Sequence, residues 1–156
     1  VYKRQRQYQA ICLGSRLPDS EILESTIGRS PFNRLKMAAN VKNAKRALTH
    51  MKTMEVFKHF SHVELTLETG RTHQIRVHLS ELLNAPILND FTYGRTKEEQ
   101  HLMTSKLKSL LKNYEHPLLH AKVLGFTHPI TKKELYFEQN PPLIFQEILQ
   151  TLRESV

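Results

Sequence analysis

The sequence predicts an α+β domain in which helices flank a mainly antiparallel sheet. Two observations lead to this prediction: several segments have strand periodicity and are bounded by turns, and three others have helical periodicity. The chain has 156 residues and 39% hydrophobic content, enough apolar material for one domain of ordinary size. It contains no internal repeat or low-complexity linker. We therefore expect residues 1–156 to form one domain without a second.

Five segments are expected to be strands. In residues 63–68 apolar and polar side chains alternate, which is the period-two pattern of a strand with one buried face. The extended stretch 47–57 precedes it, so a turn near residues 58–61 would make an antiparallel hairpin. Residues 8–13 are also compatible with a strand. Towards the end of the chain, residues 118–126 and 134–137 predict two strands on either side of the His128-Pro129 turn.

Three segments are expected to be helices. Thr72 is a plausible N-cap for the first, whose apolar residues recur at helical spacing as far as Leu83, and Pro86 lies just past its end. Apolar residues between 103 and 114 predict a second amphipathic helix. The third follows Pro141-Pro142 and covers residues 143–152.

The charge is strongly basic and unevenly distributed. The formal net charge is +8, and between Ser25 and Met54 there are seven Lys or Arg residues and no Asp or Glu. Such a balance favours a polyanionic partner, either nucleic acid or an anionic membrane. Charge alone does not choose between these partners, and a solvated basic loop and strand is an equally good interpretation of the run itself.

Composition and the chain start bear on the cellular compartment. The single cysteine, Cys12, cannot form an internal disulfide and leaves no cysteine-based metal cluster, which favours a reducing cytoplasm. The first residues contain no apolar signal-peptide core, and no later apolar run is long enough to span a bilayer. We expect a soluble cytoplasmic protein whose first residue here, Val1, is internal to a longer chain.

The segment 68–79 concentrates chemically active side chains at a strand-to-helix corner. It holds two arginines and two histidines: Arg71, His73, Arg76 and His78. The start of a helix exposes unpaired N–H groups, and guanidinium groups add directional donors, so this corner suits a phosphate or a carboxylate. Gly70 is expected to allow the tight turn. A capped surface helix with a polar first turn is the alternative.

The residues of this corner are similar to a known family motif. Thr69 to Leu79, Thr-Gly-Arg-Thr-His-Gln-Ile-Arg-Val-His-Leu, closely resembles the motif of the RluA-type RNA pseudouridine synthases. Other blocks resemble that family in the same order, from about Arg6 to Pro142: Arg6-Gln7-Tyr8-Gln9-Ala10 with Gly14, Arg34-Leu35-Lys36-Met37, Ala85-Pro86-Ile87-Leu88-Asn89-Asp90 with Tyr93-Gly94, Leu119-His120-Ala121 and His128-Pro129. The resemblance implies part of the pseudouridine synthase catalytic fold.

The resemblance also implies an activity and three active-site roles. Such an enzyme isomerises uridine to pseudouridine within RNA, either ribosomal, chiefly of the large subunit, or transfer RNA, and needs no cofactor. Tyr8 would stack on the flipped target base. Ile75 would pack beneath the base, and Arg76 would pair with the catalytic aspartate and keep it ionised. Without the resemblance, each of these residues has an ordinary structural explanation.

The resemblance also implies that the nucleophile is missing. In the family it is an aspartate in a His-Arg-Leu-Asp motif that precedes the strand of Tyr8. The only aspartates here are Asp19, in a Pro-Asp-Ser loop, and Asp90, in a different family block. We therefore expect the nucleophile upstream of Val1, in a missing N-terminal part of the same protein, and expect residues 1–156 to be inactive alone. Asn89 stands where the family usually has glycine, which leaves the loop conformation before Asp90 open.

Contacts with RNA are expected from four cationic or polar side chains. Arg71 and His73 lie at the corner, and Arg34 and Lys36 lie in the acid-free stretch. All four are expected to neutralise phosphates.

Four other kinds of function fit the sequence less well than the synthase. A non-catalytic RNA-binding module on the same scaffold is the main alternative. A metal site is not expected, because the spaced histidine pairs 59/62 and 116/120 have no cysteines or clustered carboxylates to complete them. A Ser-His-Asp hydrolase lacks the Gly-x-Ser-x-Gly turn. A membrane-surface protein lacks a basic amphipathic helix.

Overall fold

The computed structural model describes residues 4–155, which fold around one seven-stranded sheet. The order across the sheet is β3-β2-β4-β5-β1-β6-β7, and every neighbouring pair is antiparallel. In chain order the strands are β1 (Gln5–Leu13), β2 (Ser20–Arg29), β3 (Met37–Ala39), β4 (Lys45–Val56), β5 (Phe60–Leu67), β6 (Leu119–Thr127) and β7 (Glu134–Glu138). The predicted α+β class with a mainly antiparallel sheet is confirmed.

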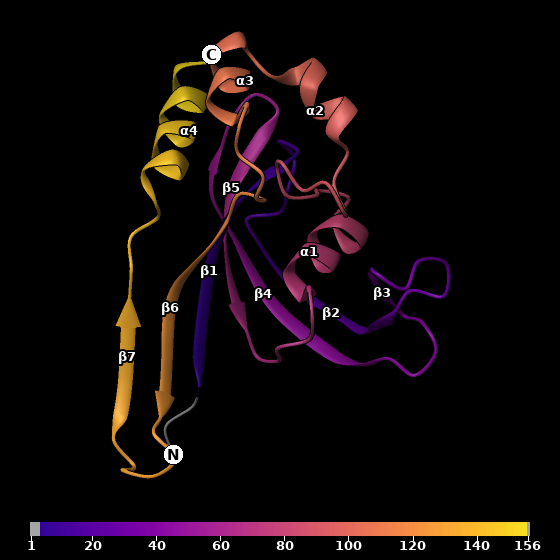
Figure 1. The fold of residues 1–156 in the computed structure, drawn as a ribbon, viewed down its shortest axis with the longest axis vertical. Coiled ribbons are helices and arrows are strands. Elements are labelled where there is room, and N and C mark those ends of the chain that lie inside the picture. The colour runs from indigo at the N-terminus through magenta and orange to yellow at the C-terminus, as the bar shows by residue number, and fades with distance from the viewer. Residues whose placement is uncertain (1–3, 156) are drawn as a thin grey trace.

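The two predicted hairpins are present. Strands β4 and β5 pair with Met51 opposite Leu65, and the chain reverses where the N–H of Phe57 donates to the carbonyl of Phe60. Strands β6 and β7 pair with Leu124 opposite Phe137. Figure 1 shows β7 at one edge of the sheet and β3, with its loops, at the other.

Strands β2 and β3 had not been predicted. In β2 the buried side chains alternate at Leu23, Ser25 and Ile27. Because Ser25 is polar and Ile22 is exposed, the period-two pattern is hidden in the sequence. Strand β3 has three residues and no periodicity to detect.

The first helix differs from its prediction in both its start and its type. Thr72 is exposed, and the residue at the N-cap is His73, whose side chain forms no capping hydrogen bond. The assignment of Thr72 as N-cap was therefore wrong. One α-helical turn, α1 (Gln74–Val77), leads directly into a π-helical turn, η1 (His78–Leu82), which ends close to the expected position.

The remaining helices lie towards one end of the sheet (Figure 1). The second predicted helix is shorter than expected: α3 (Ser105–Leu111) begins after Thr104, whose hydroxyl accepts the N–H of Leu107. A further helix, α2 (Thr96–Leu102), was not predicted. The third predicted helix is confirmed as α4 (Leu143–Glu154).

The core lies between the middle of the sheet and these helices. Strand β1 contributes Ala10 and Ile11, while α4 contributes Phe145 and Ile148, all buried. A smaller buried cluster joins Ile27 of β2, Ala47 of β4 and Val77 of α1 with Tyr93. Among the helices of the described residues, none has the length and apolar content needed to cross a membrane.

Candidate active site

The corner between β5 and α1 is held by the side chain of Gln74. Its Oε1 accepts the hydroxyl of Thr69 at 2.8 Å and the N–H of Arg71 at 3.0 Å. Its Nε2 donates to the carbonyl of Leu48 at 3.0 Å and to Thr49 Oγ1 at 2.9 Å, both on β4. Because Gln74 is buried and bonded on both sides, the corner is fixed to the sheet.

The residue that turns the backbone at this corner is His73 rather than Gly70. His73 has φ 56°, in the left-handed region that non-glycine residues seldom adopt. Gly70 is not in that region, but a methyl group added to it would collide with the guanidinium of Arg6. Since the arginine side chain is flexible and can move aside, neither backbone freedom nor space requires glycine at position 70, which corrects the role expected for Gly70.

Arg76 is held by Asp90. Its Nε and Nη2 donate to Oδ2 and Oδ1 of that carboxylate, each at 2.8 Å. Asp90 is fully buried and its Oδ1 also accepts the N–H groups of Thr92 and Tyr93. Burial raises the pKa of Asp90, but the hydrogen bonds from Arg76 and from the backbone outweigh it and leave the pKa below its ordinary value. The pair is therefore ionised and Arg76 has a fixed orientation.

Tyr93 joins four of the surrounding groups. Its hydroxyl accepts the N–H of Met37 at 2.9 Å and lies 2.7 Å from Nδ1 of His73. The guanidinium of Arg76 lies 4.9 Å from the ring centroid and the ammonium of Lys36 lies 5.4 Å from it. One tyrosine therefore connects the loop before β3 with the corner.

This arrangement defines the state of His73. The Tyr93 oxygen accepts a hydrogen bond from the N–H of Met37 and shares a second hydrogen bond with Nδ1 of His73. Burial, and after it the positive charge of Arg76, lower the pKa of His73. The lowered pKa favours the neutral ring, so His73 acts at this corner as a hydrogen-bonding group, and its contact with RNA stays a prediction.

Five of the seven predicted site residues line one cavity of about 540 Å³. They are Tyr8, Arg71, His73, Ile75 and Arg76. Tyr8 is half-buried on β1, and Ile75 is buried beside it in the core. The other lining residues are Leu67, Gln74, Tyr114, His116, Pro117 and Leu119. The segment 114–119 had not been predicted as part of the site, although its last residue, Leu119, begins a matched family block.

Arg34 and Lys36 do not line this cavity. Arg34 is exposed on the loop between β2 and β3, and Lys36 lies over Tyr93 at the edge of the same cluster. The predicted site residues therefore form two groups: five line the cavity, and Arg34 and Lys36 lie outside it, on the loop before β3.

Asn89 adopts the left-handed conformation with φ 66°. Asparagine tolerates this region better than most residues other than glycine. Its amide nitrogen also donates to the carbonyls of Tyr114 and His116, each at 2.9 Å. Asn89 therefore supports the loop before Asp90 and ties it to one wall of the cavity.

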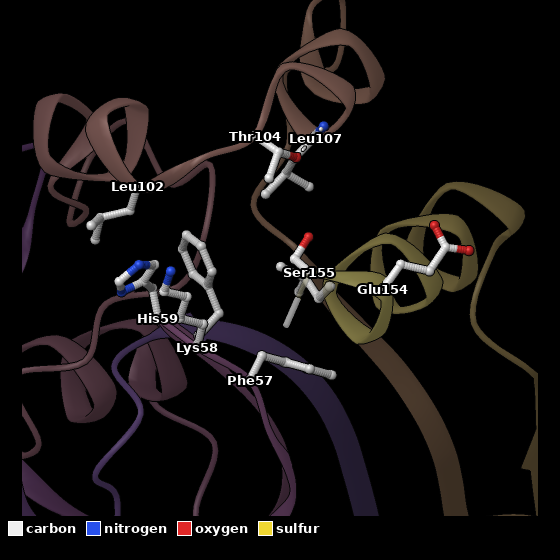
Figure 2. Close-up of a pocket in the computed structure, with 10 residues that line it drawn as sticks. Phe57, Lys58, His59, Leu102, Thr104, Leu107, Glu154 and Ser155 are labelled. Atoms are coloured by element: carbon white, nitrogen blue, oxygen red, sulfur yellow. Dashed lines mark hydrogen bonds between the residues drawn. The ribbon is translucent and has the colours of Figure 1, made fainter.

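A second cavity, of about 420 Å³, lies at the helical end of the molecule. Figure 2 shows Lys58 and His59 of the β4–β5 turn facing Leu102 and Thr104, with Glu154 and Ser155 at the end of α4. None of the residues singled out for catalysis or RNA contact lines it.

The sequence model of the family described as RNA pseudouridylate synthase matches residues 2–81, about half of the chain. The chain belongs to the RNA pseudouridylate synthase family. The matched residues include β1, with Tyr8, and the corner with Ile75 and Arg76.

Curated members of the synthase family are similar over almost the whole chain. Ribosomal large subunit pseudouridine synthase D of Vibrio vulnificus is 37% identical over 150 residues, covering 96% of this chain and 45% of the relative. The protein of the same name from Neisseria meningitidis serogroup A is 40% identical over 149 residues, covering 95% and 38%. The chain thus spans less than half of the length of these relatives.

Two solved structures share the synthase fold. Human RNA pseudouridylate synthase domain containing 4 has a TM-score of 0.70 at 28% identity, covering 96% of this chain and 62% of that structure. Human RNA pseudouridylate synthase domain containing 1 has a TM-score of 0.68 at 22% identity, covering 96% and 66%. At 22% identity, the similarity to the second of these structures concerns the fold alone.

Proposed function

We propose that this chain forms the C-terminal portion of the catalytic domain of an enzyme that isomerises uridine to pseudouridine in RNA. The observation that carries the proposal is the cavity that brings Tyr8, Ile75 and Arg76 together. In this reaction the bond from the ribose C1′ to N1 of uracil breaks, the base rotates, and C1′ bonds to C5. The proton lost from C5 is balanced by the one gained at N1. Atoms and electrons are conserved, so no cofactor is needed.

The cavity fits the base-holding part of that reaction. The aromatic ring of Tyr8 offers a stacking surface for a base taken out of the RNA, and Ile75 offers apolar contact beneath it. Arg71, His73 and Gln74 supply polar atoms around the same space, since all three line it. A pocket with an apolar floor and a few polar groups is suited to fixing the orientation of a small planar ligand.

Arg76 is proposed to bind the nucleophilic carboxylate as well as Asp90. A guanidinium has more N–H donors than the Nε and Nη2 groups that Asp90 uses. Neither aspartate of the chain lines the cavity: Asp19 is exposed just before β2, and Asp90 is fully buried in its ion pair. We propose that the nucleophile comes from residues N-terminal to this segment, and that Asp90 orients Arg76 to receive it.

The proposed substrate is large-subunit ribosomal RNA, and the proposed compartment is the cytoplasm. The names of the similar curated proteins support the RNA class, and the net charge of +8 is suited to any polyanionic RNA. Transfer RNA, the other substrate expected from the family resemblance, is the competing class.

The proposal is tested by measuring pseudouridine directly. RNA from cells with and without the intact gene is sequenced by a pseudouridine-sensitive chemical method, and we expect one or more large-subunit sites to lose the modification. In a purified assay the 156-residue chain should show no turnover, while the longer protein should modify RNA and Tyr8→Ala in that protein should abolish turnover. Turnover by the 156 residues alone would contradict the proposal that the nucleophile comes from residues N-terminal to this segment.

A further inference from the structure

The loop between β2 and β3, residues 30–36, has a fixed backbone. The hydroxyl of Ser30 accepts the N–H groups of Phe32 and Asn33, each at 3.2 Å. The side chain of Asn33 accepts the N–H of Leu35 at 3.0 Å, and Ser30 and Lys36 are joined through their backbones. The loop is therefore a hydrogen-bonded turn that presents its side chains in defined directions.

This turn exposes two large apolar side chains. Phe32 is 97% exposed and Leu35 is 83% exposed. Neither belongs to a hydrophobic cluster of the described residues. Single exposed apolar side chains are common on protein surfaces, so exposure alone identifies no partner for Phe32. What distinguishes Phe32 is the charge of the turn that carries it.

The charge around the turn indicates what that partner is. Arg29, Arg34 and Lys36 lie on or beside the turn, within the stretch 25–54 that contains no acidic residue. Nη1 of Arg29 donates to the carbonyl of Arg34 at 3.1 Å, so the turn is braced by one of its own cations. A turn that carries both an exposed aromatic ring and several cationic side chains matches a nucleic acid strand, whose phosphates meet the cations while an unpaired base stacks on the ring.

The turn is also connected to the cavity. The N–H of Met37, the residue that follows it, donates to the hydroxyl of Tyr93, and Lys36 lies over the Tyr93 ring. Tyr93 in turn contacts His73 and Arg76, which line the cavity. In Figure 1 the loops of β3 project from the sheet on the side of α1. A single RNA bound at the cavity can therefore extend onto the turn.

We propose that Phe32 stacks on an unpaired base of the substrate RNA next to the nucleotide held in the cavity, while Arg29 and Arg34 bind the adjoining phosphates. This inference rests on the proposed function, because it identifies a second contact of the same RNA. It adds a preference for unpaired RNA over duplex RNA at the turn, since a base within a duplex has no free face for Phe32.

The test uses a short single-stranded RNA of mixed sequence and the duplex of the same sequence. Phe32→Ala should weaken binding of the single strand about 10- to 100-fold, as expected for loss of one stacked base, and should change duplex binding far less. The salt dependence of single-strand binding should be the same for Phe32→Ala and the natural chain, because phenylalanine neutralises no phosphate. Phe32→Tyr should bind as the natural chain does. Ile130→Ala is the matched control, because Ile130 is 84% exposed in the β6–β7 turn.

Fluorescence gives an independent measurement. The chain has no tryptophan, so Phe32→Trp introduces a single indole at the turn. We expect the single-stranded RNA to quench its emission, while Ile130→Trp should not be quenched.

The outcomes separate this inference from the proposed function. If the natural chain binds the single strand but Phe32→Ala binds it equally well, or if Phe32→Trp is not quenched, the stacking contact is wrong and the synthase proposal stands. Such a result would favour a protein partner for Phe32. If the natural chain binds neither RNA, both proposals fail.

Discussion

His73 and Asn89 determine the backbone path around the candidate site, and both have positive φ. Side-chain periodicity carries no information about φ at a single position, so the sequence could not identify His73 as the turning residue. Asn89 was recognisable as a departure from the usual glycine of its family block. Its conformation explains that departure, since asparagine and glycine share tolerance for this region.

Removal of the Arg76 side chain should destabilise the fold strongly. In Arg76→Ala, the carboxylate of Asp90 would remain buried without its ion-pair partner, and breaking a buried pair in this way costs about 3–5 kcal/mol. Urea unfolding monitored by circular dichroism measures the change in the free energy of unfolding.

Arg46→Ala is the matched control for that measurement. Arg46 pairs with Glu24, but both side chains are more than half exposed, so the expected loss is about 1 kcal/mol or less. Equal losses for Arg46→Ala and Arg76→Ala would contradict the structural importance assigned to the buried pair.

Among the elements, the helix after the corner differs most from its prediction. Apolar spacings of three and four residues fit an α-helix and a short π-turn equally well, so the sequence could not predict η1. The turn is held at its start by His78, which is fully buried between two hydroxyls: Nδ1 lies 2.8 Å from Thr49 Oγ1 and Nε2 lies 3.0 Å from Ser25 Oγ. His78 thus joins η1 to β2 and β4.

His78 should make the fold sensitive to acid. Burial lowers the pKa of His78 from 6.5 to about 4. Its contribution to stability is complete above pH 6.5, where both states are neutral, and is lost as the pH falls towards 4, because only the unfolded chain takes up the proton. The loss is about 3 kcal/mol. In urea titrations from pH 7 to pH 4, acidification should change the stability of the natural chain less favourably than that of His78→Gln, by about 3 kcal/mol, and His101→Gln is the exposed control.

Glu99, near the start of α2, should have the opposite effect. It is 1% exposed, its Oε2 accepts the N–H of Asn89 at 3.2 Å, and its Oε1 has no hydrogen-bond partner among the described residues. Burial raises its pKa from 4.5 to about 7. The folded state holds this proton more tightly than the unfolded state, so stability decreases as the pH rises from 4.5 through 7.

Glu99→Gln removes that titration. Between pH 5 and pH 8 the variant should lack the loss of up to about 3 kcal/mol that Glu99 contributes as the pH rises, so its stability relative to the natural chain should increase with pH. Glu98→Gln is the control, because the side chain of Glu98 is half exposed in an ion pair with Arg95. Identical pH profiles for the natural chain and Glu99→Gln would show that Glu99 has no such effect.

At the scale of the whole molecule, charge should determine how RNA affinity depends on salt. Each phosphate contact adds about 0.7 to 0.9 to the slope of log affinity against log salt. If Arg34 and Lys36 each contact a phosphate, Arg34→Ala and Lys36→Ala should each reduce the slope by about that amount. Lys108→Ala, on an exposed face of α3, should leave it unchanged. An unchanged slope for Arg34→Ala or Lys36→Ala would remove that residue from the RNA contact.

The sequence predicted the fold class, both hairpins and α4, because their apolar periodicity is intact. It could not predict β2, whose buried face includes Ser25, or α2, where the buried Glu99 interrupts the apolar pattern. At the site, Tyr8, Ile75 and Arg76 came from motif resemblance, while Asp90 as the partner of Arg76 required the fold. Tyr93, which lies twenty positions after His73 and contacts it, shows no sign of that contact in the sequence.

The central position of β1 has a consequence for synthesis on the ribosome. Tyr8 pairs with Leu65 on one side and with Ala121 on the other. Strand β1 therefore leaves the ribosome long before β5 and β6, its two neighbours. The edge of β1 that pairs with β6 has no partner until β6 has been translated. Nascent intermediates with a bare edge are prone to misassembly. Chaperone dependence should therefore be greatest for ribosomes stalled between β5 and β6.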